Sequence, residues 1–435
     1  MIKILNLTKL SKEEYQKILK RSFGRDKEVV NCVKKIMEKI KTSGNREIIG
    51  KYQKRFGREK YRSIKVMPGE IVKAYKEVDG KFIRAIKQMI KNITAVHKEQ
   101  LPKKIEAKVV PEKGISVWRV WRPIEKVGLY VPGGRAVYPS SVLMTAIPAR
   151  IAGSSEIIMC SPPAYDGQIP AATLVAADLV GLKNIYKVGG AEAIAAMTYG
   201  TESIPKVYKI YGAGNSYVTT AKMLALEEVA IDMPAGPSEV MILIDGTANP
   251  KYVVSDLLAD AEHGPDSACT IVVLKSQKSF IVQDCVREIE KQVGNLLTCD
   301  RIKESLDKYG AIVEVDTIED AVEFINDYAP EHLEIMTNNP EKIVPLVQNA
   351  GSVFLGPYTT KSAGDYATGA NHVLPTGGTA KMYPPLGVDA FGKWMQVQKC
   401  TKEGLRQIKN TIETVAIVEQ LPAHKNSATI RFIKN

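Results

Sequence analysis

The chain has 435 residues, of which 45% are hydrophobic and 25% are charged. This length exceeds what one hydrophobic core usually serves, so we expect two or three domains. No apolar run approaches the roughly 18 residues of a membrane helix, which excludes a membrane partner. The start of the chain, Met1–Ile4, lacks the apolar segment and cleavage site of a secretion signal.

The positive charge lies at the amino-terminal end of the chain. Residues 1–125 hold 33 lysines and arginines against 14 acidic residues, and the remainder holds 27 against 34. A basic region can bind nucleic acid, but we find no zinc finger, RNA-binding aromatic motif or helix-turn-helix pattern in it. We interpret it as a solvated helical surface and expect no nucleic acid partner. Steep salt dependence of DNA binding would support the alternative.

The cysteines indicate a reducing environment. They form no CxxC pair and no dense framework, so we expect a cytoplasmic protein in which each is a buried apolar side chain. The six are Cys32, Cys160, Cys269, Cys285, Cys299 and Cys400.

The first 125 residues are predicted to be mainly helical. Ser11 and Glu14 form a capping box at the start of residues 11–100, in which apolar side chains recur at helical spacing. Pro68–Gly69 interrupts the pattern, and residues 82–96 form another helix. Ile115, Val117 and Val120 then alternate as in a strand.

From Val127 onward, short apolar strands alternate with helices. This alternation is typical of parallel sheets covered by helices, and two such series indicate two α/β units. The first series has strands at 127–131, 156–160, 184–188, 207–210 and 229–232, with a helix at 171–182. The second has strands at 240–244, 270–274, 311–315, 333–337 and 352–355, with helices at 251–263, 280–293, 318–328 and 340–349.

The last part of the chain has a different composition. Residues 363–378 contain four glycines and few apolar side chains, so we expect a long loop, and loops of this length are usually functional or disordered. A final helix at 402–419 leads into a polar tail.

The helix predicted for 251–263 ends in a candidate metal site. Gly264 and Pro265 terminate it, which places Asp260 and His263 three residues apart on one face of the last turn. A carboxylate and an imidazole at this spacing can bind one metal ion, with further ligands from elsewhere. The alternative is a capped surface helix with two polar residues at its end.

Four of the five histidines lie in distinctive settings. His97 lies in the basic helical region, and we interpret it as a surface residue. The others lie in segments that contain acidic residues or at the end of a predicted element, and neutral imidazole is both a metal ligand and a base near pH 7. They are His263, His332, His372 and His424.

Together, the motifs around these residues resemble the L-histidinol dehydrogenase family. They occur in order over most of the chain beyond residue 115. They are Gly-Leu-Tyr-Val-Pro-Gly-Gly at 128–134, Gly-Ala-Gly-Asn at 212–215, Ala-Gly-Pro-Ser-Glu at 235–239, Glu-His-Gly-Pro-Asp-Ser at 262–267, Ala-Pro-Glu-His-Leu at 329–333, Ser-Ala-Gly-Asp-Tyr at 362–366, Asn-His-Val-Leu-Pro-Thr at 371–376 and Ala-His-Lys-Asn at 423–426.

The resemblance implies oxidation of L-histidinol to L-histidine with two NAD, a zinc site and an intertwined homodimer whose active site is shared between subunits. The implied catalytic pair is Glu331 and His332. The implied metal ligands are Asp260, His263, Asp365 and, from the partner chain, His424. The implied substrate contacts are Ser238, His372 and Glu419 together with Asp260, His263, His332, Asp365 and His424, and the cofactor contacts are Tyr130, Glu192 and Asn215.

We therefore expect an α/β protein with two incomplete Rossmann-like parallel-sheet domains, a helical N-terminal region and a small C-terminal tail domain. The expected ranges are 1–24 for an N-terminal arm, 25–129 with 247–385 for the first α/β domain, 130–246 for the second on the NAD side, and 386–435 for the tail, packed on the partner subunit.

The reaction assigns roles to the catalytic pair. His332 suits the base that takes the hydroxyl proton, because the ordinary pKa of histidine is near 6.5. Glu331 can orient or deprotonate the water that adds to the aldehyde. In this family the metal is thought to hold the imidazole and amino nitrogens of the substrate as a template, and Glu419 would recognise its charge. A strand start with a surface Glu-His pair is the alternative for 331–332.

Two residues depart from the family pattern, which usually has glutamine at the positions of Asp260 and Glu192. The carboxylate of Asp260 leads us to expect tighter metal retention and tolerance of manganese, which an unchanged zinc affinity of Asp260→Gln would refute. Glu192 would weaken NAD binding unless a lysine or a proton offsets its charge. Residues 212–218 begin like GxGxxG but lack the third glycine, so we expect a non-standard, weak dinucleotide site.

Two other functions remain alternatives. A dehydrogenase of another amino alcohol or polyol could use the same scaffold, and an assay comparing histidinol with simple diols separates the two. A metallohydrolase could use the same ligands with an open water, and it would turn over substrate without reducing NAD.

Overall fold

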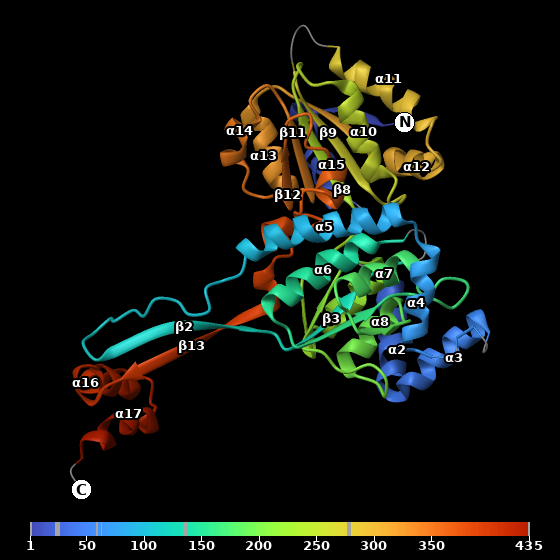
Figure 1. Cartoon of the computed structure of the whole chain (residues 1–435). Coiled ribbons are helices and arrows are strands. Elements are labelled where there is room, and N and C mark those ends of the chain that lie inside the picture. Colours follow the sequence, from blue (N-terminus) through green and yellow to red (C-terminus); the bar gives the residue numbers. More distant parts are fainter. Residues whose placement is uncertain are drawn as a thin grey trace.

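The computed structural model describes residues 2–21, 27–57, 60–61, 63–133, 137–275 and 280–433. It shows two α/β units, one above the other in Figure 1, and a long antiparallel strand pair that carries the carboxyl-terminal helices away from them. Within the part of the chain that is described, no helix combines the length and apolar character that crossing a membrane requires.

The upper unit is built on a six-stranded parallel sheet in the order β1-β10-β9-β8-β11-β12. The side chains of the central strand β8 alternate between its two faces, because successive residues of a strand point to opposite sides. Val240, Ile242 and Ile244 join one core, and Met241 and Leu243 join the other. The strands are β1 (Lys3–Asn6), β8 (Glu239–Ile244), β9 (Ala268–Leu274), β10 (Ala311–Val315), β11 (His332–Met336) and β12 (Ser352–Leu355).

Helices cover both faces of this sheet, which explains why its central strands are almost wholly apolar. One core takes side chains of α10 (Pro250–Ala261), α11 (Ile281–Val293) and α12 (Cys299–Tyr309). The other takes side chains of α13 (Ile318–Tyr328), α14 (Pro340–Ile343) and, at its margin, α1 (Lys12–Lys20). Figure 1 shows the two helical layers on either side of the strands.

The lower unit is a five-stranded parallel sheet in the order β5-β4-β3-β6-β7. Its strands are β3 (Lys126–Tyr130), β4 (Glu156–Cys160), β5 (Asn184–Tyr186), β6 (Lys209–Tyr211) and β7 (Ala230–Ile231). Its helices are α6 (Pro139–Ala152), α7 (Ala171–Leu179), α8 (Gly190–Tyr199) and α9 (Ser216–Leu224), and the amino-terminal helices α2 (Lys27–Ser43), α3 (Asn45–Phe56), α4 (Pro68–Glu77) and α5 (Gly80–Glu99) pack around them.

The two sheets share one connectivity. In each, the first strand of the series lies centrally, the next two strands extend to one side, and the last two extend to the other. This order is that of the Rossmann fold without its sixth strand, with a topological switch point where the direction reverses. The switch lies between β3 and β6 in the lower sheet and between β8 and β11 in the upper one. The predicted fold class is confirmed.

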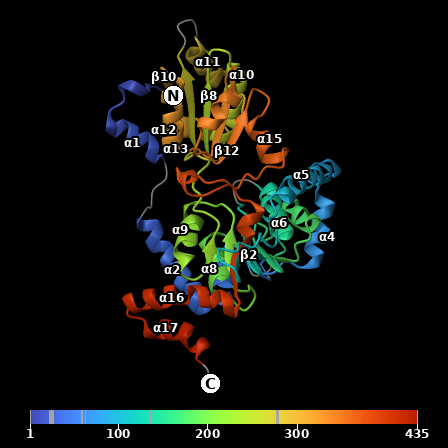
Figure 2. The same ribbon diagram turned by 90° about the vertical axis from the view of Figure 1, so that its left-hand side faces the viewer.

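The carboxyl-terminal part of the chain forms an arm. Strand β13 (Gly392–Cys400) pairs antiparallel with β2 (Ile115–Pro123) along its whole length. At its far end lie α16 (Lys402–Val418) and α17 (Pro422–Thr429), apart from both sheets in Figure 1 and below the lower unit in Figure 2. The two helices bury only Gly404, Ala416 and Ala428, so they have almost no core of their own.

The structure corrects several predictions. The polar tail contains α17, and the predicted loop at 363–378 begins inside helix α15 (Lys361–Tyr366). His97 is not a surface residue: it is fully buried, its Nδ1 donates to the Ile93 carbonyl at 2.8 Å, and its Nε2 accepts from Asn371 at 3.1 Å. Cys32 and Cys400 are exposed and Cys299 is partly so, whereas the other three cysteines are buried.

The strand pairing also departs from the predicted domain ranges. Strand β1, placed in the arm 1–24, is an edge strand of the six-stranded sheet, and β8, placed in 130–246, is a central strand of the same sheet. Helices α2–α5, placed with the metal-binding domain, pack on the five-stranded unit. The boundary at 24–25 lies outside the described residues, and the rest of the division stays a prediction.

Candidate active site

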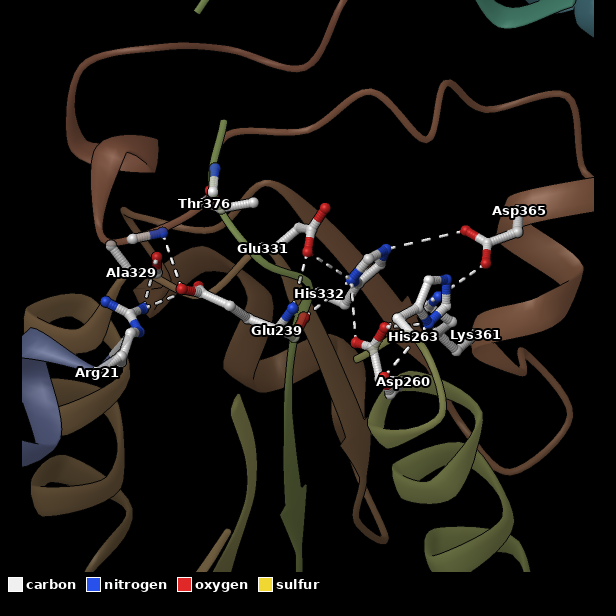
Figure 3. A network of polar contacts seen from close by, with 12 residues as sticks. Arg21, Glu239, Asp260, His263, Ala329, Glu331, His332, Lys361, Asp365 and Thr376 are labelled. Atoms are coloured by element: carbon white, nitrogen blue, oxygen red, sulfur yellow. Dashed lines mark hydrogen bonds and ion pairs between the residues drawn. The ribbon is translucent and has the colours of Figure 1, made fainter. Parts of the chain in front are cut away.

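A cluster of buried acidic and imidazole side chains lies at the amino ends of β8 and β11 (Figure 3). Glu239 and His332 are the first residues of these neighbouring strands, and the His332 position pairs with Val240. Asp260 comes from the last turn of α10 and Asp365 from α15. Ligands of open α/β sheets usually bind at the carboxyl ends of strands, so this cluster lies at the opposite edge.

The surroundings of His332 fix its tautomer. Its Nδ1 lies 2.9 Å from the backbone carbonyl of Glu239, and because a carbonyl only accepts, Nδ1 must carry the proton. The ring is 3% exposed, and Nε2 has no hydrogen-bond partner among the described residues. The unprotonated nitrogen of neutral His332 is therefore free to accept a proton.

Glu331 is held directly beside this imidazole. Its Oε2 accepts the backbone N–H of Glu239 at 2.8 Å and lies 3.6 Å from Nδ1 of His332. Burial raises the pKa of Glu331 to about 8, although the charge of His332 opposes the shift. Burial alone would lower the pKa of His332, but the charges of Glu331 and Asp260 raise it to about 9. The two groups therefore titrate as one acid–imidazole pair.

Replacing Glu331 with glutamine should shift the acid limb of the pH profile, in which the rate rises as His332 loses its proton. The carboxylate raises the pKa of His332, so its removal should lower that pKa, and the neutral base should appear at lower pH. We expect kcat/KM for histidinol to level off at least about one pH unit earlier than in the wild type. Glu304→Gln, at an exposed ion pair on α12, is the control. An unshifted limb would show that the limb does not report His332.

Three of the four predicted metal ligands lie together, and a lysine lies among them (Figure 3). Nζ of Lys361 is 3.0 Å from Oδ1 of Asp260 and 2.8 Å from Oδ2 of Asp365. Nδ1 of His263 donates to the Asp260 backbone carbonyl at 3.2 Å, which leaves its Nε2 as a potential ligand.

The charges in this group shift one another's pKa values. Burial would raise the pKa of Asp260, but Lys361 and His332 outweigh it and hold it well below its ordinary value. The pKa of Asp365 is lowered in the same way, against burial, by Lys361 and His372. Burial and the charge of Lys361 lower the pKa of His263. The site therefore combines two carboxylates and a histidine that favours its neutral, ligand form.

The fourth predicted ligand is not part of this cluster. His424 is exposed on α17, and the predicted substrate contact Glu419 is exposed at the end of α16. Both helices lie at the end of the arm, far from α10 and α15 in Figure 1. Within one chain, His424 and Glu419 therefore lie far from the other predicted metal ligands.

The other two predicted substrate contacts lie beside the cluster. His372 is half-buried, with Nδ1 3.2 Å from the Asp365 carbonyl and Nε2 3.3 Å from Oγ of Ser141. Burial lowers its pKa. Ser238 is half-buried immediately before β8, where its carbonyl accepts the Ala268 N–H at 3.0 Å.

The donor set suits a divalent cation, although the described residues do not form a closed metal site. No three histidine, cysteine or acidic side chains among them converge closely enough to hold an ion. Both carboxylate oxygens of Asp260 are fully buried, and among the described residues the cation that compensates them is Lys361, which forms an ion pair with Oδ1. Two carboxylates and an imidazole are ligands that divalent zinc and manganese accept, so Asp260, His263 and Asp365 fit the implied metal.

The three predicted cofactor contacts lie at the carboxyl ends of strands in the five-stranded sheet. Tyr130 ends β3, and Asn215 follows β6 and caps α9, so the two flank the switch point where nucleotides commonly bind. The Tyr130 hydroxyl accepts the N–H of Gly190 at 3.1 Å, at the start of the helix that carries Glu192. Gly134 of the neighbouring motif lies outside the described residues.

Glu192 does not stand alone at this edge. It is 5% exposed in the first turn of α8 and forms an ion pair with Lys51 of α3. Lys51 therefore offsets the negative charge of Glu192.

Sequence reasoning missed two residues of the cluster, Lys361 and Arg21. Nη2 of Arg21 lies 3.1 Å from Oε2 of Glu239, and its guanidinium lies over the ring of Tyr328. Arg21 comes from the end of α1, more than 200 residues away in sequence, so no local pattern revealed it. Lys361 precedes Asp365 by one helical turn, but this spacing gave no signal because helix α15 was not predicted.

Several known proteins are similar to this chain over almost its whole length. The family model described as histidinol dehydrogenase matches residues 19–432. The histidinol dehydrogenases of Methanothermobacter thermautotrophicus and Methanocaldococcus jannaschii are 43% and 44% identical to the chain, over 98% of it and 98% of each relative. The crystal structure of histidinol dehydrogenase from Elizabethkingia anophelis is 40% identical and superposes with a TM-score of 0.92, covering 99% of this chain and 98% of that one. The chain belongs to the histidinol dehydrogenase family.

Proposed function

We propose that the chain oxidises L-histidinol to L-histidine through histidinal, with NAD as the acceptor in both steps. The observation that carries the proposal is the buried Nε2 of His332, which accepts no hydrogen bond from the described residues and belongs to a ring that lies near the carboxylates of Glu331, Asp260 and Asp365. Alcohol oxidation needs such a base, because the hydroxyl proton must leave as the hydride departs.

The contacts of the pair assign its steps. The hydrogen bond from Nδ1 to the Glu239 carbonyl holds the His332 ring, so that Nε2 faces the reacting hydroxyl. Glu331 is fixed through one oxygen to the Glu239 N–H, and its other oxygen can orient the water that adds to the aldehyde. The neighbouring carboxylates stabilise the imidazolium that forms when His332 accepts a proton.

Asp260, His263 and Asp365, with His424 of the partner subunit, would hold the metal, zinc or manganese. When bound, the metal supplies a template for the imidazole and amino nitrogens of the substrate. His372 is fixed by the Asp365 carbonyl beside this position, and Ser238 lies next to Glu239 at the same edge.

The arm supports a homodimer with a shared site. Its helices leave large apolar side chains exposed, a surface that a folded protein usually covers with a partner. These side chains include Val415, Ile417, Val418, Leu421, Ile430 and Ile433, each at least 39% exposed. Packing this surface on a second copy would carry His424 and Glu419 to the cluster of the other subunit, in an arrangement with two-fold symmetry.

The NAD site would use Tyr130, Glu192 and Asn215.

The Lys51–Glu192 ion pair leads to a prediction for this site. Lys51→Met should raise KM for NAD by about three- to tenfold, because it leaves a carboxylate uncompensated near the dinucleotide phosphates. The double variant Lys51→Met/Glu192→Gln should recover most of that loss, which a double-mutant cycle measures. Additive effects in the cycle would mean that the two charges act independently.

The test of the function is a count of NADH against histidine. Absorbance of NADH is followed with L-histidinol before and after chelation, and histidine is quantified in the same sample. We expect about two NADH for each histidine and loss of activity on chelation. Equal activity with simple diols would identify a polyol dehydrogenase, and turnover of substrate without NADH would identify a hydrolase.

A further inference from the structure

Lys361 is a buried cation of the cluster in Figure 3 to which the proposed mechanism gives no role. It is the first residue of α15, and it is 2% exposed. Lysine is almost never buried to this extent unless opposite charges pair with it. Helical spacing places Lys361 on the same face as Asp365, and the end of α10 brings Asp260 to its other side.

The ammonium of Lys361 lies between the two carboxylates that would bind the metal. It is within 3.0 Å of one oxygen of each of two predicted metal ligands, which belong to different helices. An ion bound by these two oxygens, Oδ1 of Asp260 and Oδ2 of Asp365, would occupy the space between them, and that space holds Nζ of Lys361. An ammonium and a divalent metal cannot both fill this volume.

The charge balance supports the same conclusion. Asp260 and Asp365 together carry two negative charges, which a divalent metal would neutralise. Lys361 already offsets one of them, so a metal gains the full attraction of both carboxylates only after this ammonium has been displaced. Asp260 adds a negative charge where the family usually has glutamine, and Lys361 offsets that charge. The expected tighter retention of metal therefore does not follow from Asp260 alone.

We infer that Lys361 is an internal cation that competes with the divalent metal for Asp260 and Asp365, so that metal binds only when the ammonium leaves the two carboxylates. The inference rests on the proposed metal site. Molecules in which Lys361 bridges the carboxylates do not bind metal, and this fraction lowers the apparent affinity of the whole population. Lys361 would thereby set how readily the protein loses its metal.

The test is the affinity for metal alone, without substrate or NAD. The metal-free full-length protein is titrated with Zn²⁺ and, separately, Mn²⁺ by calorimetry, and the bound metal is counted by elemental analysis. We expect Lys361→Met to bind both ions at least about tenfold more tightly than the wild type, since the competing charge is gone. Its melting temperature should also rise more on addition of metal, because its metal-free form has two uncompensated carboxylates.

Lys187→Met is the matched control. Lys187 is also 2% exposed and pairs with a carboxylate, Glu70, at 2.7 Å, but it lies in the five-stranded unit. Its replacement should leave the metal affinity unchanged. If Lys361→Met does not fold without metal, Lys361→Gln, which can still donate hydrogen bonds to a carboxylate, is titrated in its place, and tighter binding is again expected.

The outcomes separate this inference from the proposed function. Equal or weaker metal binding by both Lys361 variants would overturn the competition, whether or not the protein oxidises histidinol. If the Lys361 variants bind metal more tightly and the wild-type protein does not oxidise histidinol, the competition is supported and the proposed function is wrong.

Discussion

Replacing His332 with asparagine should lower kcat for histidinol oxidation by about 10²- to 10⁴-fold, with a much smaller change in KM. The amide of asparagine can take the place of Nδ1 and donate to the Glu239 carbonyl, whereas nothing replaces Nε2. The variant therefore removes the base and keeps the hydrogen bond that positions the side chain. Steady-state rates of NADH formation at saturating NAD measure the effect.

Two measurements separate loss of the base from loss of structure. The melting temperature and the stoichiometry of bound Zn²⁺ should stay close to those of the wild type, because Asp260, His263 and Asp365 are unchanged. A variant that keeps more than about a tenth of the wild-type kcat, with both properties intact, would exclude His332 as the base.

Mixing two inactive variants should restore activity if the site is shared between subunits. His424→Ala alone should lose activity about 100-fold or more, by analogy with other losses around metal sites. In a mixed dimer with His332→Asn, one site carries both defects, and the other takes its His332 from one chain and its His424 from the other. Random exchange after mild denaturation makes half of the dimers mixed, so about one quarter of the wild-type activity should return.

The control for this experiment uses two defects within the same cluster. His332→Asn mixed with Asp260→Asn should recover nothing, because both residues belong to the part of the site built by one chain. If His424→Ala also fails to complement His332→Asn under conditions in which subunits exchange, then His424 does not act across the interface.

The sequence alone predicted the parts of the fold that rest on local patterns. The apolar strands of both series and the fold class are confirmed, because strands buried on both faces form short apolar runs between helices. Strand β1 was missed, since Lys3–Asn6 mixes polar and apolar residues and becomes a strand only through β10. Strand β13 was missed for the same reason: its partner β2 lies about 270 residues earlier.

The candidate site shows the same limit. The motifs brought Asp260, His263, Glu331 and His332 to attention, and the structure places them together. His97 was misread, because a single helix does not reveal that Asn371, 274 positions later, covers it. Whether Lys361 points to solvent or to a carboxylate depends on where α10 ends relative to α15, which spacing within one element does not determine.

The position of β1 at the edge of the six-stranded sheet has a consequence for synthesis on the ribosome. Lys3 pairs with Ala311, so β1 has no neighbouring strand until some three hundred further residues have been translated. At roughly 5 to 20 residues per second, that delay is about 15 to 60 s. Throughout it, the segment that contains β1 is available to chaperones and proteases, and β1 can join its sheet only after β2 to β9 have been made.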